Sequence, residues 1–265
     1  MTDSRCWNWH RYSVRVLHSG WARELVERSG LRAGERALDV ACGTGAVARW
    51  IAPIVGAAGR TVALDLDPEM IEVAKALEPP SAGTIEWLIA PAYPLAFADA
   101  SFDVAFVQQG LQFFPDRGAA VAELRRVLVP DGRAAVTVYR AVEHNPSAAV
   151  MADVLGRRFG DTARATLLHG HALGDAGELD RLFRAAGFAH VDLQVSERIA
   201  RWASVDEFVT SQLTGCTKVA QVLPADATQQ LAAIAREVRE RLARFVEPGA
   251  FAVPMQSHVV LARGA

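Results

Sequence analysis

Apolar residues follow two alternating patterns along the chain between about residues 20 and 190. Short apolar runs, such as those at 36–40 and 61–65, are each followed by a segment in which apolar positions recur every three to four residues. The first pattern is typical of buried strands and the second of amphipathic helices. We therefore predict an α/β protein in which strands and helices alternate.

Turn and cap residues divide this region into successive elements. Pro68 suits the first turn of a helix, and Gly30 and Gly56 suit helix ends. The predicted helices are 21–29, 46–54, 69–77 and 118–127, and the predicted strands are 36–40, 61–65, 84–89, 102–107 and 133–139, with a stop at 130–132. Continuous apolar strands between helices indicate a parallel sheet that is covered on both faces. The prediction is a doubly wound, mostly parallel sheet.

The pattern changes after residue 140, where helical segments dominate. We predict helices over 147–159 and 178–186, mostly helical structure over 206–247, and strands over 191–195 and 258–261. The sequence shows no repeat and no low-complexity linker in this part. We therefore predict a single domain over residues 21–265, with lid insertions at about 140–180 and 200–250 and an amino-terminal cap segment at 1–20.

Charge and cysteine usage exclude several classes of protein. The 28 basic and 30 acidic residues give a net charge of −2, so we expect no nucleic acid partner. Cys6, Cys42 and Cys216 are scattered, which indicates neither a disulfide framework nor a thiolate zinc site. No segment has the ~20 consecutive apolar residues of a membrane span, and no signal peptide is visible. We expect a cytoplasmic protein without a membrane partner, and a homodimer is left open.

The first predicted strand runs into a glycine-rich segment that opens a helix. Residues 43–48 match the G-x-G-x-x-A pattern, in which glycine lets the backbone approach a ligand closely. Asp65 follows Gly45 by 65 − 45 = 20 residues and could accept hydrogen bonds from ribose hydroxyls. Asp39, just before the loop, would repel a pyrophosphate and attract an ammonium group. S-adenosylmethionine carries such an ammonium, so we favour it over a nicotinamide dinucleotide.

Four stretches in this order carry a resemblance to a known family. They are LDVACGTG at 38–45, ALDLDPEM at 63–70, LAFADASFD at 95–103 and LRRVLVPDG at 124–132. Over about residues 20 to 140 the chain resembles class I S-adenosylmethionine-dependent methyltransferases of type 11. That group includes the ubiquinone and menaquinone biosynthesis C-methyltransferases. The resemblance implies a seven-stranded Rossmann-like methyltransferase fold with a helical lid, and S-adenosyl-L-methionine as cofactor.

The resemblance also implies the cofactor-binding residues. Asp39 and the backbone of Ala41, Gly43 and Gly45 would border the methionine part, Asp65 would bind the ribose, and Leu66 and Met70 would enclose the adenine. Pro91 and Ala92 would lie at the adenine edge, and Gln108 would cover the methionine end. The family usually has an acidic or amide residue where this chain has Pro91, so adenine would be held by the Ala92 backbone and by packing.

The sequence defines the residues that would bind the methyl acceptor less clearly than the cofactor-binding residues. Gln109, just past the fourth predicted strand, could position a polar substrate, and His144 or His10 could act as a base. His169 and His171 have the spacing of metal ligands without an accompanying acidic or thiolate cluster, so we predict no metal site. The predicted function is methyl transfer to a small, largely apolar acceptor at an O, N or C atom. The alternatives are a non-catalytic S-adenosylmethionine-binding protein and a nicotinamide-dependent oxidoreductase.

Overall fold

The computed structural model describes residues 4–78, 80–215 and 217–264, and these form two compact units. The sheet unit comprises Ser19–Val138, Asp175–Ser196 and Ser257–Ala265. The helical unit comprises Met1–His18, Tyr139–Gly174 and Glu197–Gln256. Cys216 and three residues of the predicted cap segment lie outside the described residues.

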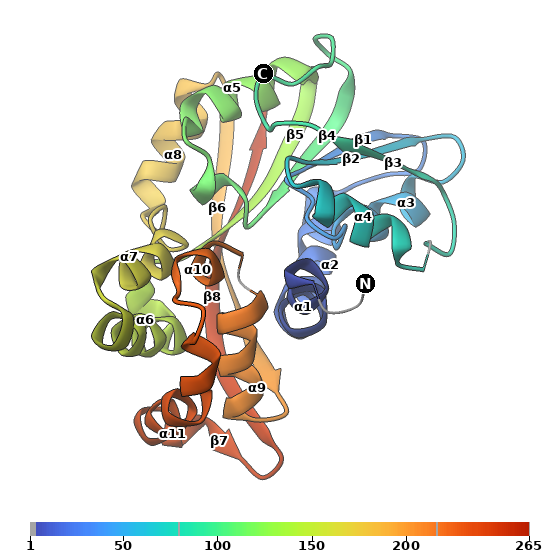
Figure 1. The fold of residues 1–265 in the computed structure, drawn as a ribbon. Helices are drawn as coiled ribbons and strands as arrows, with labels where there is room; N and C mark the ends of the chain where they lie inside the picture. The colour runs from blue at the N-terminus through green and yellow to red at the C-terminus, as the bar shows by residue number, and fades with distance from the viewer. Residues whose placement is uncertain (1–3, 79, 216, 265) are drawn as a thin grey trace. The chain divides into compact units, whose positions relative to one another are not determined.

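The sheet unit alternates strands and helices along the chain (Figure 1). Its elements are α2 (Ser19–Ser29), β1 (Arg36–Val40), α3 (Ala48–Val55), β2 (Arg60–Asp65), α4 (Pro68–Ala76), β3 (Ile85–Ile89), β4 (Phe102–Gln108), η2 (Leu111–Phe113), α5 (Arg117–Val127), β5 (Leu128–Tyr139) and α8 (Ala176–Ala185). The strands β5, β6 (His190–Trp202) and β8 (Ala250–Arg263) contribute residues to both units.

The strands form one sheet in the order β3-β2-β1-β4-β5-β8-β6, with the short β7 (Val246–Glu247) pairing with β8. The pairs β1–β2, β1–β4, β2–β3 and β4–β5 are parallel, and β7–β8 is antiparallel. The predicted doubly wound, mostly parallel sheet is confirmed. The order holds the seven predicted strands, and β7 is an eighth strand that the sequence pattern did not predict.

The strand order places a topological switch between β1 and β4. From β1 the chain moves through α3 and α4 toward the β3 edge, whereas from β4 it moves through α5 in the opposite direction to β5. Right-handed crossovers then require α5 to lie on the sheet face opposite to α3 and α4. The chain therefore leaves β1 and β4 toward opposite faces of the sheet, and open α/β sheets bind their ligands at the carboxyl ends of such a pair of strands.

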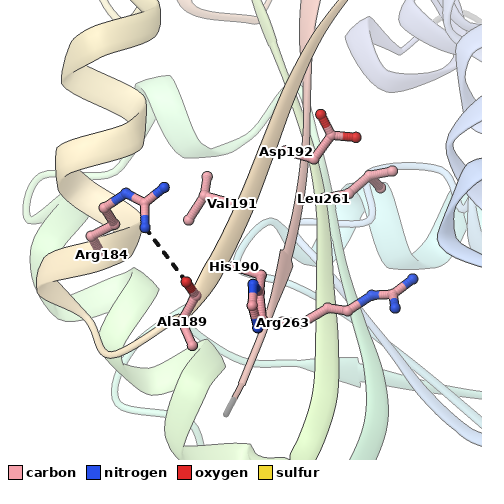
Figure 2. Close-up of a pocket in the computed structure, with 7 residues that line it drawn as sticks. All are labelled: Arg184, Ala189, His190, Val191, Asp192, Leu261 and Arg263. Carbon is pink, nitrogen blue, oxygen red and sulfur yellow. Dashed lines mark hydrogen bonds between the residues drawn. The ribbon is translucent and has the colours of Figure 1, made fainter.

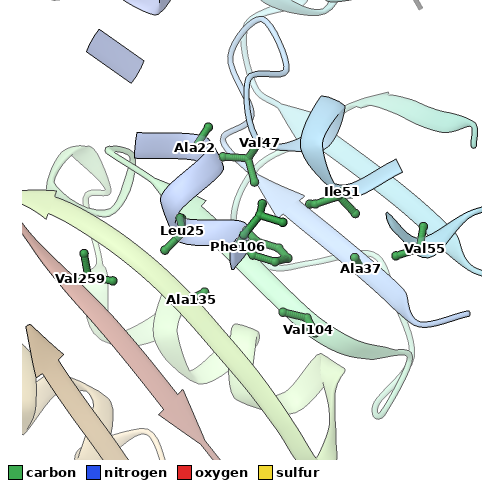
Figure 3. Close-up of a cluster of buried hydrophobic side chains, with 11 residues drawn as sticks. Ala22, Leu25, Ala37, Val47, Ile51, Val55, Val104, Phe106, Ala135 and Val259 are labelled. Carbon is green, nitrogen blue, oxygen red and sulfur yellow. The ribbon is translucent and has the colours of Figure 1, made fainter. Parts of the chain in front are cut away.

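One face of the sheet packs against α2 and α3 (Figure 3). Apolar side chains of β1, β4 and β5 alternate toward these helices, because successive residues of a strand point to opposite faces. The cluster contains Ala22, Leu25, Val26, Ala37, Val47, Ile51, Val55, Val104, Phe106, Ala135 and Val259. Burial of these side chains holds β1 and β4 in place, and the loops that follow these two strands begin at their carboxyl ends.

The structure differs from the predicted elements at five places. Residues 130–132, predicted as a stop, lie inside β5, where the pairing with β4 shifts register between Phe102 and Val104. The strands β6 and β8 extend far beyond 191–195 and 258–261 because both carry polar residues that hid the strand pattern. α7 (Asp161–His169) was not predicted. The range 206–247, predicted as mostly helical, is divided into short helices, and α11 (Leu231–Arg241) has short 3-10 turns before and after it.

The helical unit is built mainly from short helices. They are α1 (Arg5–Trp9), η1 (His10–His18), η3 (Val142–His144), α6 (Pro146–Phe159), α7, α9 (Val205–Thr210), η4 (Ser211–Gly215), α10 (Thr217–Val222), η5 (Ala227–Gln230), α11 and η6 (Ala243–Phe245). The segments η1 and η4 are π-helical, a conformation that is rare and often found at functional sites. Trp202, Phe208 and Phe251 pack with ring centroids 4.9 to 6.0 Å apart. Whether this unit acts as a lid stays a prediction.

Candidate functional site

The loop after β1 has an unusual backbone that exposes part of its surface. Ala41 and Gly43 have φ values of 55° and 54°, in the left-handed region that favours glycine. The loop is anchored by a hydrogen bond from Cys42 N to Leu64 O at 2.9 Å and from Gly45 N to Cys42 O at 2.9 Å. Apart from its two chain neighbours, no residue that the structure describes has an atom within 4 Å of the position that a Cβ on Gly43 would take. Gly43 therefore borders open space at the edge of the loop.

Gly45 is required for a different reason. A Cβ at Gly45 would lie 2.3 Å from the Trp87 ring of β3, and its φ is 83°. The Arg49 guanidinium carbon lies 5.6 Å from the Trp87 ring centroid. The sequence pattern treated both glycines as places for ligand approach, but Gly45 serves the packing of β3 against the loop. Trp87 was not singled out because nothing in the sequence pairs it with residue 45.

Asp65 ends β2 and links it to the glycine loop. Its Oδ2 accepts a hydrogen bond from Gly43 N at 2.8 Å, and its Oδ1 accepts one from Asp67 N at 3.0 Å. Burial raises the pKa of Asp65, and these backbone N–H donors oppose that rise. Each carboxylate oxygen has a second lone pair. The Asp65 carboxylate can therefore hold the loop and still accept hydrogen bonds from a ligand.

Asp39 lies beneath the loop with 1% of its surface exposed. Its Oδ2 accepts a hydrogen bond from Ala48 N at 3.0 Å, and its Oδ1 has no partner among the described residues. Burial, together with the nearby Asp65, raises the pKa of Asp39 to about 8. The carboxyl group is therefore mostly protonated at neutral pH in the ligand-free protein. Its buried Oδ1 could therefore interact with a positively charged group of a ligand.

The residues predicted to contact adenine differ in exposure. Leu66 is 71% exposed, whereas Met70 is 8% exposed within α4. Pro91 is exposed and Ala92 is half-buried, and their segment starts beside β2, because Ala90 N donates to Asp65 O at 3.0 Å. Leu66 is thus an apolar side chain left in solvent directly after Asp65. Met70 packs mostly into the protein and offers little surface to a ligand.

The loop after β4 lies against the loop after β1. A Cβ on Gly110 would lie 2.9 Å from the Cβ of Ala41. Gln108 is half-buried at the end of β4, and Gln109, with a φ of 53°, is 8% exposed. Gln109 Nε2 donates to Ser257 Oγ at 2.9 Å, and Gln109 Oε1 accepts from Gln112 Nε2 at 3.2 Å. The Gln109 amide is thus already bonded on both sides, a network that its isolated position in the sequence did not reveal.

The two candidate bases belong to the helical unit. His144 is exposed at the end of η3, and His10 is half-buried with its ring 6.2 Å from that of Trp7 in an edge-on arrangement. The structure thus brings together Asp39, Ala41, Gly43, Asp65 and Gln109 in the sheet unit. It gives no such grouping for His10 and His144.

A separate open hollow of about 650 Å³ lies where β6 begins and β8 ends (Figure 2). Arg184, His190, Asp192 and Arg263 are among the residues that line it. Arg184 donates to the carbonyl of Ala189, as Figure 2 shows, and forms an ion pair with Asp180. β6 is the edge strand farthest in the order from β3, so this hollow does not include the residues predicted to bind a cofactor.

A doubly wound sheet with a glycine loop after β1 and an acid after β2 defines a class of domains that bind nucleoside-containing cofactors. Residues 38–136 match the model of a family described as methyltransferase domain. The ubiquinone/menaquinone biosynthesis C-methyltransferase UbiE of Ectopseudomonas oleovorans is 38% identical over 119 residues, which cover 44% of this chain and 70% of the relative. The chain belongs to the S-adenosylmethionine-dependent methyltransferase family, and its cofactor is S-adenosylmethionine.

Two further comparisons define the extent of the similarity. The 2-phytyl-1,4-naphtoquinone methyltransferase of Synechococcus elongatus is 37% identical over 122 residues, which are 45% of this chain and 52% of the relative. The chain thus spans about half the length of several curated relatives that it matches. A methyltransferase structure from Bacillus halodurans C-125 covers 91% of this chain and 97% of its own, with a TM-score of 0.60 and 21% identity. That likeness shows the fold.

The residues of the sheet unit suit this cofactor. A ligand that carries a ribose, a base and an ammonium group would meet four matching features. They are the open space beside Gly43, the spare acceptor capacity of Asp65, the exposed Leu66 and the unpartnered Asp39 oxygen.

In the described part of the chain, no helix is both long enough and apolar enough to cross a bilayer.

Proposed function

We propose that this protein transfers the methyl group of S-adenosylmethionine to a small, largely apolar acceptor. The observation that supports this most is the Asp65 carboxylate, which holds Gly43 N at 2.8 Å and stands beside the exposed Leu66. This arrangement offers a hydrogen-bond acceptor for ribose hydroxyls and an apolar surface for adenine at the switch point of the sheet.

In this proposal most of the predicted cofactor-binding residues have a defined task, and Met70 and Pro91 have none. Asp65 accepts the ribose hydroxyls, Leu66 covers the adenine, and the backbone near Ala92 meets the adenine edge. The loop of Ala41 and Gly43 borders the methionine part, with Gln108 at its other side. Gly45 and Asp39 support the loop from within, Gly45 by admitting Trp87 and Asp39 by accepting from Ala48 N. When bound, the cofactor supplies an electrophilic methyl group.

The acceptor is proposed from the chemistry of the relatives. One relative is named for a naphthoquinone and another for ubiquinone and menaquinone biosynthesis, and a quinone-derived ring is largely apolar, in agreement with the sequence prediction. We therefore propose a hydroxylated ring of this chemical kind, with the attacked atom left open between O, N and C. A cytoplasmic location and a homodimer remain part of the proposal. The net charge of −2 supports the absence of a nucleic acid partner.

Calorimetric titration with S-adenosylhomocysteine, the demethylated cofactor, tests the proposal. We expect the wild-type protein to bind it and Leu66→Ser to bind it roughly 5- to 30-fold more weakly, since an apolar contact of about 1–2 kcal/mol is lost. Leu66 is 71% exposed, so this change leaves the fold intact. Val195→Ser is the matched control, because Val195 is 50% exposed on β6, and it should bind as the wild type does.

Turnover is then measured with S-adenosylmethionine and a panel of naphthohydroquinones and simple phenols. Transfer to at least one ring, with S-adenosylhomocysteine as the second product, supports the proposal. Binding of a nicotinamide dinucleotide without any binding of S-adenosylhomocysteine would contradict it. Cofactor binding with no transfer to any acceptor of the panel would favour the non-catalytic alternative.

A further inference from the structure

The backbone leaves β4 through a strained residue. Gln109 has a φ of 53°, in the left-handed region that a residue with a Cβ adopts roughly 5- to 30-fold less readily than the right-handed one. We call residues 109–114 the β4 loop. The next residue, Gly110, lies against the glycine loop of residues 41–45, because a Cβ on it would lie 2.9 Å from the Cβ of Ala41. The contact between the two loops therefore depends on a left-handed Gln109.

Three hydrogen bonds hold Gln109 in this conformation. Its backbone N–H donates to Thr137 O at 2.8 Å. Its Nε2 donates to Ser257 Oγ at 2.9 Å, and its Oε1 accepts from Gln112 Nε2 at 3.2 Å. Gln112 Oε1 has no partner among the described residues, so Gln112 contributes only its donor. Because Gln109, Gln112 and Ser257 are all buried, water does not compete for these bonds.

The amide network of Gln109, Gln112 and Ser257 ties the β4 loop to two other strands of the sheet. The sheet order is β4-β5-β8, and Gln109 bonds to β5 through its backbone and to β8 through its side chain. These residues and Ala41 all belong to the sheet unit. Both polar ends of the Gln109 side chain are bonded within the protein. This arrangement favours a supporting role for Gln109 over direct contact with a substrate.

From this arrangement we propose that Gln112 and Ser257 are positioning residues for the cofactor. Acting through Gln109, they keep the β4 loop against the glycine loop in the conformation that binds S-adenosylmethionine. This inference rests on the cofactor binding in the proposed function, and it assigns two residues that act without touching the cofactor.

The effect of the network on cofactor affinity follows from the two conformations of Gln109. Without the network the right-handed conformation is favoured roughly 5- to 30-fold, and the contact between Gly110 and Ala41 forms only in the remaining fraction of molecules. The apparent affinity for the cofactor decreases by that fraction. The network thus preorganises the β4 loop before the cofactor binds.

The first test compares two replacements of Gln109 by calorimetric titration with S-adenosylhomocysteine. Gln109→Met keeps the size of the side chain but lacks both of its hydrogen bonds, so the affinity should fall at least about fivefold. Gln109→Gly lacks the same bonds, but glycine adopts the left-handed conformation about as readily as the right-handed one, so its affinity should remain within about threefold of the wild type. An equal loss in the two variants would indicate direct contact between the Gln109 amide and the ligand, and would overturn the inference.

The second test removes the partners of Gln109 one at a time. Ser257→Ala and Gln112→Met should each weaken S-adenosylhomocysteine binding about two- to tenfold. Combined with Gln109→Gly, neither change should weaken binding further, because both act through the conformation of residue 109. Undiminished effects in the combined variants would contradict the proposal.

Ser196→Ala is the matched control for Ser257→Ala. Ser196 is also a buried serine of the sheet unit that accepts a side-chain hydrogen bond, from Trp21 Nε1 at 3.1 Å. It lies on the edge strand β6, away from the β4 loop in the sheet order. Ser196→Ala should bind S-adenosylhomocysteine as the wild type does, whereas a loss as large as that of Ser257→Ala would mean that any lost buried bond weakens binding.

The third test follows amide hydrogen exchange by mass spectrometry in the absence of any ligand. Gln109→Met and Ser257→Ala should speed exchange in residues 110–114 and 41–45 and leave β2 unchanged, because only the two loops depend on the network. Unchanged exchange in both loops, or faster exchange throughout the sheet, would overturn the inference. Failure of the wild-type protein to bind S-adenosylhomocysteine would instead refute the proposed function, and the exchange rates would still decide whether the network holds the β4 loop.

Discussion

Gly43 and Gly45 are two residues apart in one loop, but a methyl group added at each would meet different surroundings. At Gly43 the added Cβ meets nothing within 4 Å, so Gly43→Ala should cost only about 1–2 kcal/mol of folding free energy from its φ of 54°. At Gly45 the Cβ would lie 2.3 Å from Trp87, so Gly45→Ala should cost more. Urea unfolding followed by fluorescence measures both values.

The effect of Gly43→Ala on cofactor affinity should be much larger than its small effect on stability. The Cβ in Gly43→Ala projects into the space proposed for the ligand, so the affinity for S-adenosylhomocysteine should fall at least tenfold although the protein remains folded. Calorimetry at a temperature where both variants are folded provides the comparison. A Gly43→Ala protein with wild-type affinity would show that the ligand does not approach the loop at this residue.

Asp39 should act as a proton switch when the cofactor binds. Its pKa of about 8 in the free protein means that the carboxyl group is mostly protonated at pH 7. An ammonium group nearby favours the charged form and lowers this pKa. Binding of S-adenosylhomocysteine at pH 7 should therefore release up to about one proton per site. Calorimetry in buffers of different ionisation enthalpy measures the release, and Asp39→Asn should abolish it. An equal release from the Asn variant would assign the proton to another group.

At the scale of elements, the strand-to-helix connections were the part that the sequence predicted best. The strands β1, β2 and β4 and the helix α4, with Pro68 at its first position, agree with prediction because apolar runs and cap residues act locally. The strands β6 and β8 were underestimated because they are 13 and 14 residues long and include polar residues. Local pattern cannot report that a polar segment is held by pairing with a distant strand.

The residues of the candidate site also divide into those that the local sequence pattern predicts and those that it does not. Asp39, Gly43 and Asp65 could be placed from the sequence because they lie at the ends of adjacent strands and on the loop between a strand and a helix. Trp87 and Ser257 could not, because their roles depend on contacts with residues that are far away in the chain. Ser257 shows this most clearly, since its hydroxyl accepts from Gln109, which lies 148 residues earlier in the chain, and no motif encodes that pairing.

Asp65 joins the end of β2 to the loop after β1, so its removal should affect both elements. In Asp65→Ala the N–H groups of Gly43 and Asp67 lose their acceptor, which should lower the free energy of unfolding by about 1–3 kcal/mol. Hydrogen exchange at these two amides should accelerate, and S-adenosylhomocysteine binding should weaken at least 100-fold through loss of the ribose contacts.

Asp67→Ala provides the matched control for this prediction. Asp67 Oδ1 accepts from Glu69 N at 3.0 Å and caps α4, so its loss should cost about 1 kcal/mol of stability. The affinity for S-adenosylhomocysteine should remain within twofold. Equal loss of affinity in the two variants would indicate that Asp65 acts only by holding the loop and makes no direct contact with the ribose.

For the whole molecule, two buried groups should shape the dependence of stability on pH in opposite directions. Burial lowers the pKa of His18 from 6.5 to about 4, so the unfolded chain binds a proton there that the folded protein does not. Stability is then lost as pH falls from 6.5 toward 4. Burial raises the pKa of Asp39 from 3.8 to about 8, so the folded protein keeps a proton that the unfolded chain releases. Stability is then lost as pH rises from 3.8 toward 8, and Asp65 acts in the same direction.

Each group can contribute up to about 1.4 kcal/mol per pH unit, so the two effects should largely cancel between pH 4 and 6.5 and leave a decline above 6.5. Asp39→Asn should uncover the effect of His18, and this variant should lose stability toward acid pH. His18→Phe should uncover the effect of Asp39, and its stability should decrease from pH 4 up to pH 8. Urea unfolding at pH 4.5, 6.5 and 8 distinguishes the three proteins. Parallel pH profiles would mean that neither burial changes proton binding on folding, because a shifted pKa in the folded state must alter the slope when its group is replaced.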